Sequence, residues 1–302
     1  MFRSILCAVD FSEQSRHALR WADRLCGSEG RLIVVSVVDP LLAGAARTRF
    51  GFDLAADVAE ALQDFVSTTV SKSVHQDARR VMALVGQTND VIRKIARQEH
   101  ADLIALGTHG LGGFRKWLLG STTEQLLRGT PVPVLAVPLI DALDTGAEHC
   151  AQPVEIDRIL AATDFSVPGN DAVTYAVDLS RAEGASLLIA HVVSPVAVAP
   201  QWRSYVGGVD EENASRARAR LEDLSRRLSS DASRVPTELV VRVGRPADGI
   251  AEIAQQHHSH VIVLGIVGES RDLAQRPGSI AYRVLCQAGV PVLVVPPVGQ
   301  PL

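Results

Sequence analysis

Long apolar runs, cysteine and net positive charge are all scarce in this sequence of 302 residues. No apolar run reaches the ~18 residues that a membrane-spanning helix needs. Asp10 and Glu13 interrupt the N-terminal stretch where a secretory signal would need an apolar core. The four cysteines have no spacing typical of metal or redox sites. These absences predict a cytoplasmic protein that does not associate with a membrane.

The balance of charge argues against nucleic acid as a partner. Lysine and arginine number 30 against 34 aspartates and glutamates, so the formal net charge is −4. Proteins that bind nucleic acid usually carry a basic footprint, which this composition lacks. The Arg-rich stretch 216–227 contains Glu222 and Asp223 and follows the acidic residues 210–212, so it is typical of a solvated helix face. We expect no nucleic-acid partner.

The sequence does contain one glycine pattern written twice. Both copies consist of G-x-x-G, nine further residues and then G-S. They fall at Gly107, Gly110, Gly120 and Ser121, and again at Gly265, Gly268, Gly278 and Ser279. Each copy follows an apolar run and precedes a helix-forming stretch, where a parallel sheet presents a loop to an anionic ligand. The pattern indicates a duplicated nucleotide-binding domain.

Four further blocks repeat in the same order, as a true duplication requires. Residues 8–12 return as 162–166, 85–87 as 243–245, His100 as His258, and 133–138 as 291–296. The shift is 154 at the first block (162 minus 8) and 158 at the second (243 minus 85), so only a short insertion separates the copies. We predict two domains, 1–140 and 156–298, with 141–155 as the linker.

Each half alternates apolar runs with stretches of helical periodicity, which predicts parallel βαβ units. The expected strands are 5–9, 32–38, 81–85, 103–106 and 132–137, then 159–163, 187–193, 238–243, 261–264 and 290–295. The expected helices of the first half are 18–26, 54–75, 89–99 and 121–128. The fold class is therefore α/β, with two doubly wound, parallel, five-stranded Rossmann-like sandwiches in tandem.

Prolines bracket the last strand of each half, at Pro131, Pro133 and Pro138 and at Pro291 and Pro296. Within sheets, proline is confined to edges, strand starts and bulges, so we expect edge strands there. Two apolar edges in one chain need covering, and pairing with each other is the simplest cover.

These features together resemble the universal stress proteins in their tandem form, which have the adenine-nucleotide α-hydrolase-like fold. The resemblance rests on the two glycine motifs, on Asp10 and Asp164 at strand ends, and on the Pro-Val-Leu-x-Val ends, and it spans almost the whole chain. It implies ATP binding, with or without Mg²⁺, and pairing of the two domains through their fifth strands as an intramolecular pseudo-dimer. Two chains could associate further as a homodimer.

The first glycine motif has a chemistry that suits a nucleotide. Gly107 and Gly110 lack side chains, so the backbone can approach a phosphate or ribose closely. Gly120 and Ser121 open a helix whose free N–H groups and dipole favour negative charge, by about 0.3–1 kcal/mol for each interaction. The hydroxyls from Ser121 to Thr123 add donors. The alternative is a tight turn with a serine helix cap and no ligand.

Asp10 ends the first strand, where open α/β sheets hold ligands and a carboxylate can accept hydrogen bonds from a ribose or adenine. Its alternative role is to start the helix that follows. The resemblance adds further pocket residues: Ala8, Val9, Val37, Leu106, His109, Thr122 and Thr123. Thr163 and Asp164 take the places of Val9 and Asp10 in the second half.

The second glycine motif is intact but chemically poorer. Ile266 and Val267 replace Thr108 and His109, and Ile280 and Ala281 replace Thr122 and Thr123. The loop also contains Glu269 and Asp272, whose carboxylates would repel a triphosphate unless Arg271 and Arg276 compensate. We expect the first domain to bind ATP more tightly than the second.

Enzymatic and metal-binding alternatives have weaker support. The chain lacks the G-x-x-x-x-G-K-[ST] phosphate loop, the G-x-S-x-G elbow and an SGGxDS-type loop, so we predict no enzyme, with slow incidental ATP hydrolysis left open. The cluster of His257, His258 and His260 has no acidic or cysteine ligand at a suitable spacing to complete a zinc site. The sequence therefore predicts an ATP-binding regulatory or stress-response module, and the alternative is a nucleotide-free scaffold that binds partners.

Overall fold

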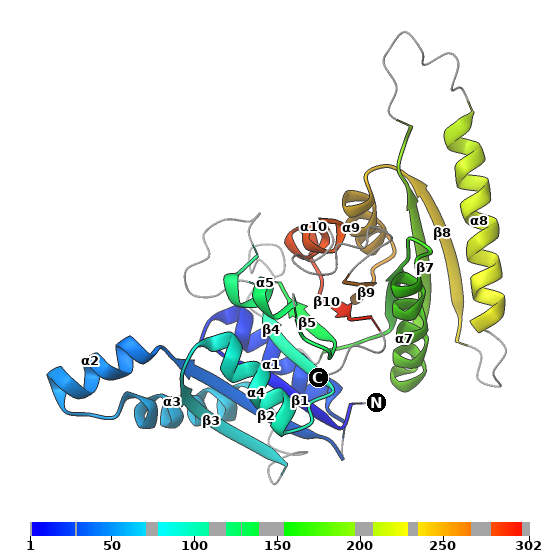
Figure 1. Ribbon diagram of the computed structural model, residues 1–302. Helices are drawn as coiled ribbons and strands as arrows, with labels where there is room; N and C mark the ends of the chain where they lie inside the picture. The colour runs from blue at the N-terminus through cyan, green and yellow to red at the C-terminus, as the bar shows by residue number, and fades with distance from the viewer. Residues whose placement is uncertain are drawn as a thin grey trace. The chain divides into compact units, whose positions relative to one another are not determined.

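In the computed structural model the chain folds into two compact units, the first built from Met1–Val154 and the second from Glu155–Gly299 (Figure 1). The residues that the structure describes are 2–27, 29–70, 78–108, 119–127, 129–138, 154–196, 208–228, 235–266 and 279–297. Residues 141–153 of the predicted linker, 141–155, are not among them, so the bounds of the linker stay a prediction.

The first unit contains a five-stranded parallel sheet, as predicted. Its strands are β1 (Ser4–Ala8), β2 (Arg31–Val38), β3 (Arg79–Val85), β4 (Leu103–Gly107) and β5 (Val134–Val137). Their order across the sheet is β3-β2-β1-β4-β5. The chain therefore extends the sheet from β1 first in one direction and then in the other, which is the doubly wound topology.

Helices cover both faces of this sheet. They are α1 (Glu13–Leu25), α2 (Pro40–Phe50), α3 (Leu54–Thr69), α4 (Thr88–Gln98) and α5 (Ser121–Leu127). α1 contacts α3, and α4 contacts α5. Right-handed crossovers in the order β3-β2-β1-β4-β5 place the first pair on one face and the second pair on the other. β1 and β4, the neighbours at the centre, therefore lead into helices on opposite sides.

The second unit repeats the same plan. Its strands are β6 (Arg158–Ala162), β7 (Ser186–Val193), β8 (Thr237–Val243), β9 (Val261–Gly265) and β10 (Val292–Val295), in the order β8-β7-β6-β9-β10. Its helices are α7 (Val167–Glu183), α8 (Val209–Leu228), α9 (Pro246–Gln256) and α10 (Ser279–Gln287). Within each unit, β5 and β10 end their sheets, which confirms the edge positions that the prolines indicate.

The core of each unit is its central strands, which are covered by helices on both faces. Ile5, Leu6 and Cys7 of β1 are fully buried, as are Ile159 and Leu160 of β6. Burial on both faces explains why these strands appear in the sequence as continuous apolar runs rather than as alternating patterns. None of the helices among the described residues is long and apolar enough to span a membrane.

Two helices of the first unit differ from the prediction. α2 was not predicted, because its sequence has no apolar periodicity and only Ala46 is buried. The helix expected over 54–75 ends at Thr69, since Val70 is already extended, with φ −112° and ψ 149°. Residues 71–77 lie outside the described part. The sequence Thr68-Thr69-Val70 is β-branched, which weakens the last turn of the helix.

Candidate functional site

The predicted site residues of the first half gather at the carboxyl ends of three neighbouring strands. In the sheet register Ala8 of β1 lies opposite Val35 of β2, and Cys7 lies opposite Ala105 of β4. Val37, the segment from Ala8 to Asp10, and Leu106 therefore all lie near one edge of the sheet. Because the chain leaves β1 and β4 toward opposite faces, this edge is the crevice in which open α/β sheets hold ligands.

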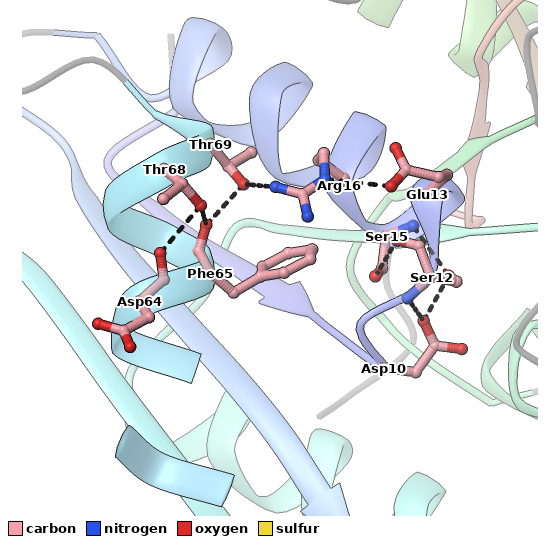
Figure 2. Close-up of polar contacts among 9 residues, drawn as sticks. All are labelled: Asp10, Ser12, Glu13, Ser15, Arg16, Asp64, Phe65, Thr68 and Thr69. Carbon is pink, nitrogen blue, oxygen red and sulfur yellow. Dashed lines mark hydrogen bonds and ion pairs between the residues drawn. The ribbon is translucent and has the colours of Figure 1, made fainter. Parts of the chain in front are cut away.

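Asp10 has a structural role at this edge. One carboxylate oxygen, Oδ1, accepts hydrogen bonds from the amide of Ser12, at 3.1 Å, and from its hydroxyl (Figure 2). Ser12 in turn caps α1, because its Oγ accepts from the amide of Ser15 at 3.2 Å. Within the described residues Oδ2 of Asp10 has no hydrogen-bond partner, so Asp10 starts the helix and still offers one oxygen to a ligand.

Gly107 ends β4 at the same end of the sheet, and the structure gives a packing reason for glycine there. A Cβ atom at this position would lie 2.7 Å from Cβ of Gln14 and 3.1 Å from its carbonyl carbon. The end of β4 therefore packs directly against the first turn of α1. This contact accounts for the glycine whether or not a phosphate approaches it.

The two ends of the first glycine loop are held together. The amide of Gly120 donates to the carbonyl of Thr108 at 2.8 Å, and Thr123 Oγ1 donates to the carbonyl of Gly107 at 3.0 Å. The Thr123 hydroxyl is therefore engaged by the protein, whereas Ser121 is exposed and Thr122 is half-buried. His109 and Gly110 lie outside the described residues.

A cluster beside Asp10 was not predicted. Phe11 adopts a left-handed φ of 66°, and its ring meets that of Phe65 of α3 edge-on at 5.5 Å. The guanidinium of Arg16 lies 4.2 Å above the Phe65 ring and donates to Thr69 Oγ1 at 2.8 Å (Figure 2). This cluster ties α1 to α3 on one flank of the crevice. Its one sequence signal is the repeated Asp-Phe-Ser, since Phe165 has φ 65°.

The second unit builds the same turn with different surroundings. Oδ1 of Asp164 accepts from the amide of Ser166 at 3.0 Å, as Asp10 does from Ser12. Thr163 takes the place of Val9. Its Oγ1 donates to Oδ1 of Asn170 at 3.1 Å and accepts from the amide of Phe165 at 2.9 Å. The polar groups at this edge are therefore already bonded to one another.

His191 of β7 takes the register position of Ser36 in β2, one residue before that of Val37, and adds to this network. Its Nδ1 lies 2.8 Å from the carbonyl of Thr163, which can only accept, so Nδ1 carries a proton. The ring packs on Phe165 at 4.5 Å, and the guanidinium of Arg220 lies 4.0 Å from that same ring. Burial, with a smaller contribution from Arg220, lowers the pKa of His191 below 6.5.

The remaining residues of the second motif are only partly described. A Cβ atom on Gly265 would lie 2.9 Å from the carbonyl oxygen of Pro168, so this glycine has the same packing reason as Gly107. Ser279 is the first residue of α10. Gly268 and Gly278 lie outside the described residues.

The histidine cluster has local partners. His257 Nδ1 lies 3.5 Å from a carboxylate oxygen of Glu238, and His260 Nδ1 accepts from the amides of Asp157 and Arg158 at 3.3 Å each. His100 and His258 both follow helices with a left-handed φ, 49° and 51°, which confirms their shared helix-end position. Among the described residues no group of three His, Cys, Asp or Glu is placed to hold a metal ion.

The fold defines a class: tandem α/β proteins in which each half is a doubly wound parallel sheet. The sequence profile of the Universal stress protein family matches residues 1–138 and 155–296. The chain therefore belongs to the universal stress protein family, in its tandem form.

Individual proteins agree with this assignment. A universal stress protein of Mycolicibacterium smegmatis is 28% identical over 309 aligned residues, which cover 97% of each chain. A universal stress protein of Synechocystis is 30% identical over 139 residues, which cover 46% of this chain and 87% of that one. Such a match to one half is what a duplication predicts.

Solved structures share the fold over both halves. A universal stress protein from Archaeoglobus fulgidus superposes with a TM-score of 0.61 at 20% identity, covering 97% of this chain and 96% of that one. A functionally unknown protein of Pseudomonas aeruginosa gives 0.65 at 19% identity, covering 98% and 93%. At these identities the likeness concerns the fold alone.

Proposed function

We propose that the protein is an ATP-binding regulatory module of the stress response, with the first unit as its better nucleotide site. The observation that carries the proposal is the convergence of Asp10, the ends of β2 and β4, and the start of α5 on one crevice. Family membership supports the same ligand class. The residues of the first unit carry the nucleotide site, and those of the second unit carry only the comparison between the two.

The residues of the first unit fit an adenine nucleotide by their chemistry. Oδ2 of Asp10 accepts hydrogen bonds from ribose hydroxyls or an adenine amino group, while Oδ1 stays bonded to Ser12. The first amides of α5 have no partner within the helix, and with the Ser121 and Thr122 hydroxyls they donate to phosphate oxygens. Mg²⁺, where bound with the nucleotide, neutralises part of the phosphate charge.

The second unit is the weaker site because its edge is already occupied by its own side chains. Thr163 bonds to both Asn170 and His191, where the first unit has Val9, Arg16 and Ser36. A ligand there would have to break these bonds or leave buried polar groups unpaired, which costs about 1–3 kcal/mol for each group. In addition, Ile280 and Ala281 offer no hydroxyl donors.

Two matched variants test the preference for the first unit. Gly120→Asp places a carboxylate at the start of α5, and Gly278→Asp places one at the equivalent position before α10. Titration calorimetry with Mg²⁺-ATP should show a large loss of affinity for the first variant and little change for the second. A larger loss from Gly278→Asp would reverse the assignment of the better site.

The rest of the proposal concerns how the module acts. We propose that nucleotide occupancy changes its surface for partners, that it works in the cytoplasm without enzymatic turnover, and that the proline-bracketed edge strands β5 and β10 pair within one chain. An ATP turnover above about 0.1 s⁻¹, still well below the usual enzyme range, would contradict the non-enzymatic part.

A nucleotide-free scaffold is the second candidate, and one observation favours it. Oδ1 of Asp10, the Thr123 hydroxyl and the Gly120 amide are all bonded within the protein, so the edge is stable without a ligand. No binding of Mg²⁺-ATP by the wild-type chain in the same titration would support this candidate.

A further inference from the structure

Among the described residues of the first unit, α2 has the most exposed apolar side chains. Leu41 and Leu42 in its first turn are 83% and 62% exposed, and Phe50 at its last residue is 74% exposed. Phe52, just beyond, is 40% exposed, and its ring lies 6.2 Å from that of Phe50. A helix that is apolar on several sides is normally buried, yet within α2 only Ala46 is.

The local sequence builds α2 as a defined helix rather than as a loop. Asp39 caps it, accepting from the amides of Leu41 at 2.8 Å and Leu42 at 3.3 Å, and Pro40 occupies the first turn. Gly51 ends it in the left-handed conformation, with φ 72°. α2 contacts α3 and projects beyond the sheet (Figure 1). The helix therefore begins and ends at defined residues, with its apolar side chains exposed.

Charge is divided between α2 and α3. α2 contains Arg47 and Arg49 and no acidic residue, whereas α3 contains Asp57, Glu60 and Asp64 and no basic residue. All five side chains belong to exposed residues. No ion pair joins them to any of the described residues. The α2–α3 hairpin, 40–69, thus presents an apolar, basic helix next to an acidic one.

We infer that the α2–α3 hairpin is a docking surface for a second copy of this chain. A two-fold axis would set α2 of each copy against α3 of the other, so that basic meets acidic twice and the exposed Leu and Phe side chains are covered. A symmetric interface needs such self-complementarity, and the opposite charges of α2 and α3 provide it. The inference is argued from residues of the first unit alone, and it does not rest on nucleotide binding.

The charge pattern also argues against a lipid surface as the occupant. Leucine, phenylalanine and arginine on one helix are typical of helices that lie on anionic membranes. The acidic row of α3 lies beside α2, however, and would be repelled by anionic lipid head groups. A partner that carries both signs of charge fits better, and the second copy does.

The size of the surface predicts a weak dimer. At 1.5 Å per residue, α2 and α3 are about 16 and 24 Å long, and two adjacent helices offer a face of roughly 400 Å² per copy. The dimer would bury about 800 Å² in total, below the ~1,200 Å² of stable complexes. We therefore expect association that depends on concentration.

Sedimentation velocity of the full chain from about 1 to 500 µM, a range that covers weak dimers, tests the inference. The wild type should shift from monomer to dimer. Leu41→Ser with Phe50→Ser should raise the dissociation constant at least about tenfold, because the variant removes apolar surface that the dimer would bury. Both residues are exposed in the single chain, so the fold should be unaffected. Val167→Ser is the matched control, since this valine is 72% exposed on α7 and lies outside the surface.

A charge-reversal pair identifies the occupant as a second copy. Arg47→Glu with Arg49→Glu makes both helices acidic, and Asp57→Lys with Glu60→Lys makes both basic, so each variant alone should stay monomeric. Mixed at equal concentration, the two variants should form a heterodimer, because acidic α2 then meets basic α3 and basic α2 meets acidic α3.

Three outcomes would overturn the inference. The wild type could stay monomeric across the whole range, or it could form a dimer that neither the Leu41/Phe50 variant nor either charge-reversal variant weakens. The third outcome is flotation of monomeric wild type, but not of the Leu41/Phe50 variant, with vesicles of phosphatidylcholine and phosphatidylserine. That result would assign α2 to a lipid surface instead.

Discussion

Gly107 and Gly265 end equivalent strands against the first turn of a helix, and no other residue fits there without movement of the backbone. A Cβ atom would lie 3.1 Å from the carbonyl carbon of Gln14 in the first unit and 2.9 Å from the carbonyl oxygen of Pro168 in the second. We predict that Gly107→Ala and Gly265→Ala each lower the free energy of unfolding by about 1–3 kcal/mol, because overpacking forces such shifts. Urea unfolding measures the change.

Gly244→Ala is the control for both variants. Nothing lies within 4 Å of a Cβ atom there, and its φ is not left-handed. Its midpoint should stay at or slightly above that of the wild type, because alanine restricts the unfolded chain. An equal loss of stability at all three glycines would contradict the packing explanation.

His191 predicts a dependence of stability on pH. Burial lowers its pKa in the folded state below the 6.5 of an exposed histidine, with Arg220 opposing its charge and Asp164 favouring it. Between the two pKa values the unfolded chain binds more protons, so this contribution is complete above pH 6.5 and is lost as the pH falls toward the folded pKa.

The measurement is the urea midpoint of wild type and His191→Gln from pH 8 to pH 5. The wild type should lose more stability over this range than the variant, in which the amide still donates to Thr163 but does not titrate. His17, whose pKa burial also lowers, remains in both proteins and cancels in the comparison. Equal slopes for the two proteins would contradict the prediction.

At the scale of elements, the sheets were predictable and α2 was not. The ten strands follow from apolar runs between turn residues, because strands covered on both faces have no polar side to interrupt the run. α2 has neither a run nor a helical period, and its signals are the Asp39 cap, Pro40 and the Gly51 terminator. Local capping chemistry, rather than periodicity, would have found this helix.

In the candidate site, too, some residues could be predicted from the sequence and others could not. Asp10 and the glycines were found because the duplication repeats them, and repeated residues are visible in one sequence. The Arg16–Phe65 contact joins α1 to α3 across 49 positions (65 minus 16), and no local sequence pattern predicts such a pair. Asn170 and His191 are visible in the sequence only as replacements of Arg16 and Ser36, and their significance depends on the hydrogen bonds that the fold creates.

α2 also predicts a local difference in dynamics. It buries one residue, whereas α1 buries Ser15, Ala18, Leu19, Trp21, Ala22 and Leu25. Opening of α2 should therefore cost little of the global stability. In hydrogen-exchange mass spectrometry at micromolar protein, amides of 43–50 should exchange faster than those of α1, and protection should rise at high protein concentration. Protection of α2 equal to that of α1 in dilute protein would contradict this prediction.

At the scale of the whole molecule, duplication has preserved one fold while the two crevices have diverged. The turn at Asp10 and that at Asp164 have the same hydrogen bonds and the same left-handed phenylalanine. Around them, the second unit satisfies its polar groups internally, whereas the first unit leaves Oδ2 of Asp10 and the exposed start of α5 available. We propose that one copy has kept the ligand and that the other serves the fold.

The most direct test of this account is the amount of nucleotide carried by the full chain. Gently purified protein is denatured, and the released nucleotide is quantified by mass spectrometry per mole of chain, with a parallel titration of nucleotide-free protein. The account predicts about one ATP per chain, the usual result for a single specific site, and loss of that ATP in Gly120→Asp. Two ATP per chain, or none together with no binding of Mg²⁺-ATP in the titration, would contradict it.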